Sequence, residues 1–224
     1  MTPQKVVEEA NEKIKEWAKE TSNKLVIGLD GYTGVGKTTL LNNLVAINPD
    51  ILTVNRDDFL FTRTEVREKL AKAEDKSVIF ELEITNDQKL IGLVNAFKNN
   101  AGEIYEIEVF NPISGETDTK KIFDLSKKIM IVEGVFMFHP KLPMSKLWDK
   151  KIYLEGHIAK IDERRIKREK EKWGDKYFPE THPDSNFRNV ITGLKRYFEL
   201  YKPSLEADLV IKVTSFIFST YTDY

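Results

Sequence analysis

The 224-residue sequence contains no cysteine, which excludes disulfides, thiolate nucleophiles and zinc sites built from cysteine. It has no apolar run long enough to cross a membrane. It also lacks an excess of positive charge, because 35 Lys and Arg are balanced by 36 Asp and Glu, and this argues against nucleic acid as a main partner. Its three histidines are far apart and without metal-ligand spacing. The composition predicts a cytoplasmic protein that binds neither nucleic acid nor a membrane.

The most informative stretch runs from Lys24 to Leu41. Leu25–Leu29 is a short apolar run typical of a buried parallel strand, and helical spacing begins after Gly36. Between these two patterns the sequence satisfies G-x-x-x-x-G-K-[ST], the phosphate-binding loop. A Gly-rich surface turn is the alternative, but the position between strand and helix favours the phosphate loop.

This motif predicts a polyphosphate site whose backbone N–H groups wrap the phosphates, with glycine where a side chain would block the approach. Lys37 supplies a point charge for the β- and γ-phosphates, and the Thr38 hydroxyl is a ligand for Mg²⁺. The helix that begins near Lys37 adds unpaired N–H groups and the positive end of its dipole. The predicted nucleotide-binding residues are Gly31, Tyr32, Thr33, Gly34, Val35, Gly36, Lys37, Thr38 and Thr39.

Acidic residues follow two further apolar strands. Asp57 and Asp58 come after the predicted strand Ile51–Asn55, and Glu133 ends the run Lys128–Glu133. Ligands of open α/β sheets gather beyond the carboxyl ends of the strands, so these carboxylates are candidates for a site. The alternative is that these residues have no role in a site. Asp is common in solvated turns, and a Glu at a strand end is usually solvated.

A charged helix is predicted over Ile158–Trp173. Its arginines Arg164, Arg165 and Arg168 fall within one and a half turns. A guanidinium group can donate two hydrogen bonds to two oxygens of one phosphate, so the cluster is a candidate phosphate clamp. A solvated helix with i,i+4 ion pairs explains the same pattern.

The remaining pattern predicts a single domain over residues 1–224. An amphipathic helix, Pro3–Thr21, lies in an added amino-terminal segment (1–22) that does not resemble a signal peptide, and it packs on the sheet or binds a partner. An insertion (77–127) holds a strand at Ser77–Thr85, a helix at Asn86–Asn99 and a hairpin, and a lid spans 158–185. The fold class is a three-layer α/β/α P-loop NTPase fold with a mostly parallel sheet. The aromatic tail, 215–224, is not assigned.

Five segments in this order resemble the uridine kinase and nicotinamide riboside kinase group, related to phosphoribulokinase and bacterial pantothenate kinase. GLDGYTGVGKTTL resembles the start of these proteins, and NRDDF their D-[DS]-F-[YF] segment. IVEGVFMF resembles their I-x-E-G strand end, ERRIKRE their lid helix, and YKPSLEADLVI their closing strand.

The resemblance implies ATP-dependent phosphorylation of a hydroxyl on a small molecule, a nucleoside or a related alcohol. It implies that Asp57 is the general base and that Asp57, Asp58 and Phe59 lie on the acceptor side. Mg²⁺ would be held by Thr38 and Glu133. The catalytic residues would be Asp57, Lys37, Arg164, Arg165 and Arg168, the arginines belonging to a closing lid.

The hairpin departs from uridine kinases, because no His or Arg follows Val109–Glu116 closely and the next basic residues are Lys120 and Lys121. This disfavours uridine or cytidine as the acceptor. A regulatory ATP-binding protein with reduced catalysis and a nucleotide or polynucleotide kinase remain alternatives. A homo-oligomer is also open. A GTPase is disfavoured, because no N-K-x-D element follows the loop.

Overall fold

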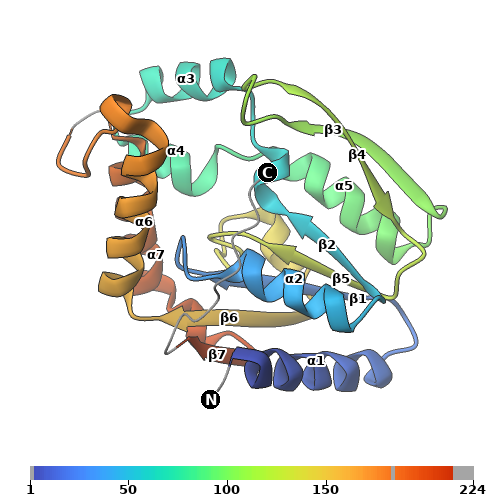
Figure 1. Cartoon of the computed structure of the whole chain (residues 1–224). Coiled ribbons are helices and arrows are strands. Elements are labelled where there is room, and N and C mark those ends of the chain that lie inside the picture. Colours follow the sequence, from blue (N-terminus) through green and yellow to red (C-terminus); the bar gives the residue numbers. More distant parts are fainter. Residues whose placement is uncertain (1–2, 183–184, 214–224) are drawn as a thin grey trace.

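The computed structural model describes residues 3–182 and 185–213. Its centre is a five-stranded sheet with the order β2-β5-β1-β6-β7, and every neighbouring pair is parallel. The strands, shown in Figure 1, are β1 (Leu25–Gly31), β2 (Ile51–Asn55), β5 (Ile129–Glu133), β6 (Lys150–Gly156) and β7 (Leu209–Val213). All residues of β1 and β5 are buried, as their apolar runs predict for central parallel strands.

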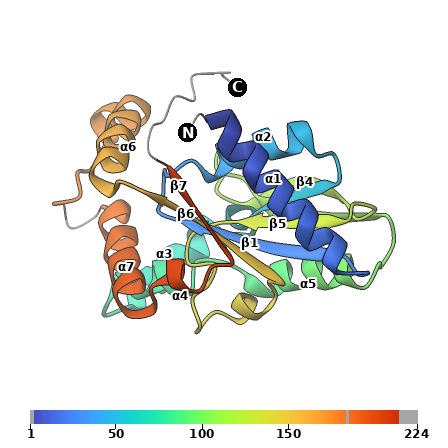
Figure 2. The ribbon, with the colours of Figure 1, turned by 90° about the horizontal axis from the view of Figure 1, so that it is seen from below.

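Helices cover both faces of the sheet. Figure 2 shows α1 (Pro3–Glu20) and α2 (Lys37–Ile47) on one face, and α5 (Asp87–Lys98) and α7 (Asn186–Tyr201) on the other. A parallel sheet requires such crossovers and buries its apolar strands between them. The three-layer α/β/α architecture expected from the sequence is therefore confirmed.

The amino-terminal helix α1 packs its apolar stripe into the core. Val7, Ala10, Ile14 and Trp17 are buried, and the Asn48 amide at the end of α2 donates a 2.9 Å hydrogen bond to the Asn11 side chain. The stripe contacts the protein's own core, and Asn11 fixes where α1 lies against α2.

The segment between β2 and β5 holds α3 (Arg63–Lys72), α4 (Lys76–Leu82), α5 and the antiparallel hairpin of β3 (Ile104–Phe110) and β4 (Thr117–Asp124). The predicted helix over 86–99 and the predicted hairpin are present. The strand predicted at Ser77–Thr85 is wrong, since most of this stretch forms α4.

Two interactions explain why this alternating sequence forms a helix. The Asp75 carboxylate accepts hydrogen bonds from the backbone N–H and the hydroxyl of Ser77, which caps the first turn. The helix also packs on α7, where a Cβ added at Gly193 would lie 3.3 Å from the Ser77 carbonyl oxygen. The short stretch fits the two-residue period of a strand and the 3.6-residue period of a helix about equally, so tertiary packing decided which of the two forms.

Beyond β5 come η2 (Pro143–Lys146), β6, α6 (Ile158–Trp173), η3 (Gly174–Lys176), α7, η4 (Pro203–Leu205) and β7. The helix predicted over Ile158–Trp173 has these bounds in the structure. Among the described helices, none is long and apolar enough to span a bilayer. The aromatic segment 215–224 lies outside the described residues.

We expect Ile14→Ala to lower the free energy of unfolding by about 3 kcal/mol, because the fully buried Ile14 side chain leaves a cavity between α1 and the core. Urea denaturation followed by circular dichroism measures the change. Lys15→Ala, on the exposed side of the same helix, is the control. Equal stabilities for the two variants would contradict the packing of α1 described above.

Candidate active site

The loop between β1 and α2 has the backbone that a phosphate cradle needs. Gly31 has φ 153°, and a Cβ there would lie 2.6 Å from the Leu154 carbonyl oxygen, so no larger residue fits. Gly36 precedes α2 with φ 110°, and no side chain caps the first turn of this helix. Its backbone N–H groups therefore remain available to an anion, and the helix dipole favours negative charge there.

The Lys37 ammonium group folds back onto this loop. It donates hydrogen bonds of 2.9 and 3.2 Å to the carbonyl oxygens of Gly31 and Tyr32. Burial lowers the pKa of Lys37, whereas the negative charges of Asp30, Glu133 and Asp57 oppose that shift. One buried cation thus interacts with carboxylates at the ends of three different strands.

Glu133 reaches the phosphate loop from the end of β5. Its Oε1 accepts a 2.7 Å hydrogen bond from the Thr38 hydroxyl, and it is paired in register with Leu29 of β1 and Asn55 of β2. Burial raises the pKa of the Glu133 carboxyl, while Thr38 and Lys37 oppose the shift. The structure brings together the two residues expected to hold Mg²⁺.

This donor pair fits Mg²⁺, which prefers oxygen ligands, keeps several waters and shares its shell with phosphates. Two protein ligands are therefore enough. No group of three or more His, Cys, Asp or Glu side chains that could hold a metal occurs in the described ranges. A cage made entirely of protein ligands is thus not found there.

Asp57 lies in η1 (Arg56–Phe59), which begins where the Asn55 side chain accepts a 2.9 Å hydrogen bond from the Asp57 N–H. The Asp57 side chain is accessible to solvent, yet protein surrounds it closely enough to remove much of its hydration. This loss raises the pKa of the Asp57 carboxyl, and the positive charges of Arg56 and Lys37 oppose the shift.

The other two residues of the predicted acceptor segment have different surroundings. Asp58 forms a 2.6 Å ion pair with Lys121 of β4, which ties the hairpin to η1. Phe59 is buried in the core, so its side chain supports η1 and is not available to an acceptor.

Sequence reasoning missed two buried ionisable residues at this edge. Asp30 accepts 2.7 Å hydrogen bonds from the Gly31 N–H and the Tyr197 hydroxyl, and burial raises its pKa. Arg56 donates a 2.8 Å bond to the Val135 carbonyl oxygen. A charged residue inside the apolar run of β1 was the available signal for Asp30, whereas the sequence shows nothing that marks Arg56 as buried.

The predicted lid helix, α6, lies against the phosphate loop. The Tyr32 hydroxyl donates to Asp162 of α6 at 2.9 Å, and a Cβ at Gly34 would lie 3.4 Å from Ile161. Asp162 in turn is 3.4 Å from the Arg165 guanidinium. A chain of polar contacts therefore joins the loop to α6.

The three lid arginines do not share one environment. Arg165 is 4% exposed, forms ion pairs with Asp162 and Glu180, and stacks on Phe187 of α7. Arg164 and Arg168 are exposed. In this arrangement Arg165 is held by carboxylates, and the cluster does not form the common clamp expected from the sequence.

The sheet order, the loop on β1 and the acidic strand ends beside it define a P-loop kinase. A model of the Phosphoribulokinase / Uridine kinase family matches residues 26–188, more than half of the chain, and the chain belongs to this family. The family resemblance expected from the motifs is confirmed.

Curated relatives agree with this assignment. The chain is 25% identical to nicotinamide riboside kinase 2 of Mus musculus over 146 residues, covering 65% of this chain and 68% of the relative. It is 25% identical to uridine kinase of Chlamydia pneumoniae over 185 residues, covering 81% and 74%. The chain is therefore an ATP-dependent kinase with an alcohol acceptor.

A solved structure shows the same fold. A possible uridine kinase from Bacillus stearothermophilus matches with a TM-score of 0.62 and 19% identity, covering 91% of this chain and 99% of that one. At this identity the likeness concerns the arrangement of sheet and helices alone.

We expect Arg165→Ala to lower the free energy of unfolding by about 3 kcal/mol, because it leaves the Glu180 and Asp162 carboxylates without their buried cation. Arg168→Ala, at an exposed position, should leave the melting temperature within about 2 °C of wild type. Differential scanning calorimetry measures both. If the Arg168 change costs as much stability as the Arg165 change, the description of α6 is wrong.

Proposed function

We propose that the protein transfers the γ-phosphate of ATP to a hydroxyl of a small molecule, a nucleoside, riboside or related alcohol. The observation that carries the proposal is the 2.7 Å hydrogen bond from the Thr38 hydroxyl at the phosphate loop to Glu133 at the end of β5, beside the buried Lys37, whose charge interacts with both Glu133 and Asp57. A donor loop, a candidate metal pair and a candidate base therefore meet at the carboxyl ends of β1, β5 and β2. The names of the curated relatives, nicotinamide riboside kinase and uridine kinase, support an acceptor of the riboside class.

Asp57 is the proposed general base. Its carboxylate takes the proton of the acceptor hydroxyl as the hydroxyl oxygen bonds to the γ-phosphorus and the bridging oxygen leaves with ADP. A raised pKa suits this role, because a base whose pKa lies closer to the working pH holds the transferred proton better. Arg56 and Lys37 still favour the ionised form needed at the start.

Lys37 and the N–H groups at the start of α2 would bind the β- and γ-phosphates, and Lys37 would leave its carbonyl partners to do so. Thr38 and Glu133 would hold Mg²⁺, which supplies charge neutralisation on the transferred phosphate. Arg164, Arg165 and Arg168 would belong to a lid over the phosphates that excludes water.

The acceptor side is bounded by η1 and the hairpin, joined by the Asp58–Lys121 ion pair. Lys121 is the basic group that the hairpin places there, where a uridine kinase would have His and Arg. A screen of ATP consumption against nucleosides, riboside vitamins, sugars and pantothenate identifies the acceptor. A polynucleotide titration in the same assay tests the polynucleotide kinase alternative, and ATP binding without any turnover would support the regulatory alternative.

We expect Asp57→Asn to lower kcat by about 100-fold or more and to leave the Kd for ATP within about threefold of wild type, because the base contacts the acceptor and not the nucleotide. Asp50→Asn, at the opposite end of β2, is the matched control. Isothermal titration calorimetry and the acceptor-dependent assay measure the two quantities. A normal kcat in the Asp57 variant would remove Asp57 from the role of base.

The same variant tests the raised pKa of Asp57. A carboxyl with a raised folded-state pKa favours folding below its ordinary pKa and loses this contribution as pH rises toward the folded value. We therefore expect Asp57→Asn to gain stability relative to wild type as pH rises above about 4, the ordinary carboxyl pKa. Urea unfolding between about pH 4 and 8 measures the difference, and a difference that falls with pH would contradict the shift.

We expect Glu133→Gln to raise the Mg²⁺ concentration for half-maximal activity by about 10-fold or more, because it removes an anionic ligand. Activity titrated with Mg²⁺ at saturating ATP measures the change. Glu116→Gln, on the hairpin turn, is a control of equal charge change. If magnesium dependence is unaltered by Glu133→Gln, the Thr38–Glu133 pair is not the metal site.

A further inference from the structure

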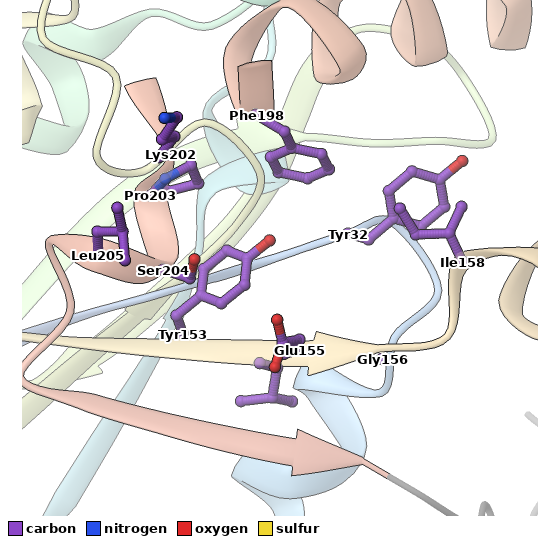
Figure 3. Close-up of a pocket in the computed structure, with 11 residues that line it drawn as sticks. Tyr32, Tyr153, Glu155, Gly156, Ile158, Phe198, Lys202, Pro203, Ser204 and Leu205 are labelled. Carbon is purple, nitrogen blue, oxygen red and sulfur yellow. The ribbon is translucent and has the colours of Figure 1, made fainter. Parts of the chain in front are cut away.

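A cavity of about 400 Å³ lies beside the phosphate loop, between β6, α7 and η4. Figure 3 shows the rings of Tyr153 and Phe198 next to one another, with Tyr32 and Ile158 at one end and Pro203 at the other. This volume lies in the range of small-molecule sites. Nothing in the proposed phosphoryl transfer uses it.

The cavity is separate from the phosphate-binding face of the loop. Tyr153 is paired in register with Asp30 and faces the α7 side of the sheet, where it packs on Phe198. The helix α2, whose first turn would bind the phosphates, covers the opposite face (Figure 2). The Asp57–Lys121 region belongs to η1 and the hairpin, which contribute no residue to the cavity wall.

The walls favour a flat ring. The Phe198 ring is 6.4 Å from Tyr153 at 90° and 6.1 Å from Tyr32 at 41°, measured between centroids. Ile158 and Leu205 are exposed apolar side chains at the rim. An aromatic molecule would cover these surfaces and gain ring contacts at suitable separations.

Polar groups in the cavity define the rest of the ligand. The Tyr153 hydroxyl has no hydrogen-bond partner among the described residues, although its residue is buried, and Figure 3 shows it directed toward the space that Phe198 and Tyr32 flank. Glu155 at the edge is paired with Lys212 at 3.7 Å. Burial and the negative charges of Asp30 and Glu155 raise the pKa of the Tyr153 hydroxyl. Lys202, beside Pro203, has no ion pair within residues 3–182 and 185–213, so the positive end of the cavity is the Lys202 end.

A ligand in this cavity would affect the ATP site through shared residues. Tyr32 belongs to both, and its hydroxyl holds Asp162 of α6, while Ile158 is the first residue of α6. A ring against Tyr32 and Ile158 would stabilise the arrangement in which Arg165 is paired with Asp162 and Glu180. That arrangement keeps Arg165 from the phosphates.

We propose that the cavity binds a small aromatic acid, a flat ring carrying a carboxylate or phosphate, and that its occupancy weakens ATP binding. The ring packs on Tyr153, Phe198 and Tyr32, and the acid group pairs with Lys202 at the end of the cavity beside Pro203. The second half of the proposal rests on the proposed function, because it needs ATP at the phosphate loop.

Naphthalene-2-carboxylate is the probe, with uncharged 2-naphthalenemethanol as its matched partner. Isothermal titration calorimetry without ATP should show tighter binding of the acid, and Lys202→Met should weaken the acid by about 3- to 5-fold while leaving the alcohol unchanged. Tyr153→Ala, which removes the ring, should weaken the acid and the alcohol equally, by about 3- to 10-fold. Ser204→Trp, which fills the cavity, should abolish binding of both.

Lys195→Met, on an exposed part of α7 outside the cavity, is the control and should bind both probes as wild type does. A second titration measures ATP with and without saturating naphthalene-2-carboxylate. The Kd for ATP should rise by about 5-fold, and the Kd for the probe should rise by the same factor in saturating ATP. In Ser204→Trp the probe should have no effect on ATP.

Three results would overturn the proposal. Equal binding of acid and alcohol would show that Lys202 selects nothing, and unchanged probe binding in Ser204→Trp would place the probe elsewhere. A dimer in sedimentation velocity that becomes a monomer in Ser204→Trp would assign the cavity to a second copy of the chain. The first titration measures probe binding without ATP, so its result does not depend on whether the protein is a kinase.

Discussion

The site depends on the interaction of the buried Lys37 ammonium group with the carboxylates around it. A cation removed from water needs nearby negative charge, and Asp30, Asp57 and Glu133 supply it from the ends of three neighbouring strands. Parallel pairing makes this possible, because the register sets Leu29 and Asn55 level with Glu133. The sheet thus fixes both the phosphate loop and the carboxylates that its lysine requires.

The helix α6 is part of the same electrostatic system. Tyr32 of the phosphate loop holds Asp162, and Asp162 shares Arg165 with Glu180. A phosphate that attracts Arg165 would have to compete with these carboxylates. The same tyrosine forms one wall of the cavity behind the loop, which is why an occupant there would act on the nucleotide.

Three placements that local sequence patterns did not predict have one physical origin. The alternating stretch from Ser77 fits a strand locally, but packing on α7 near Gly193 makes it a helix. Phe59 belongs to a recognisable segment, yet its ring fills the core beneath η1. Arg165 belongs to a lid motif, yet it is buried against Phe187. Each outcome depends on a neighbour distant in the chain, which local patterns do not contain.

The sequence by itself determined those elements that depend only on residues close together in the chain. The apolar runs of the central strands, the glycines of the phosphate loop and the order of the motifs were sufficient for the three-layer fold and for the family. Only the tertiary structure decided which charges meet: that Asp30 lies beneath the loop bonded to Tyr197, that Arg56 is buried, and that Tyr32 is tied to α6. Desolvation and Coulomb energies depend on distances through space, and spacing along the chain does not encode them.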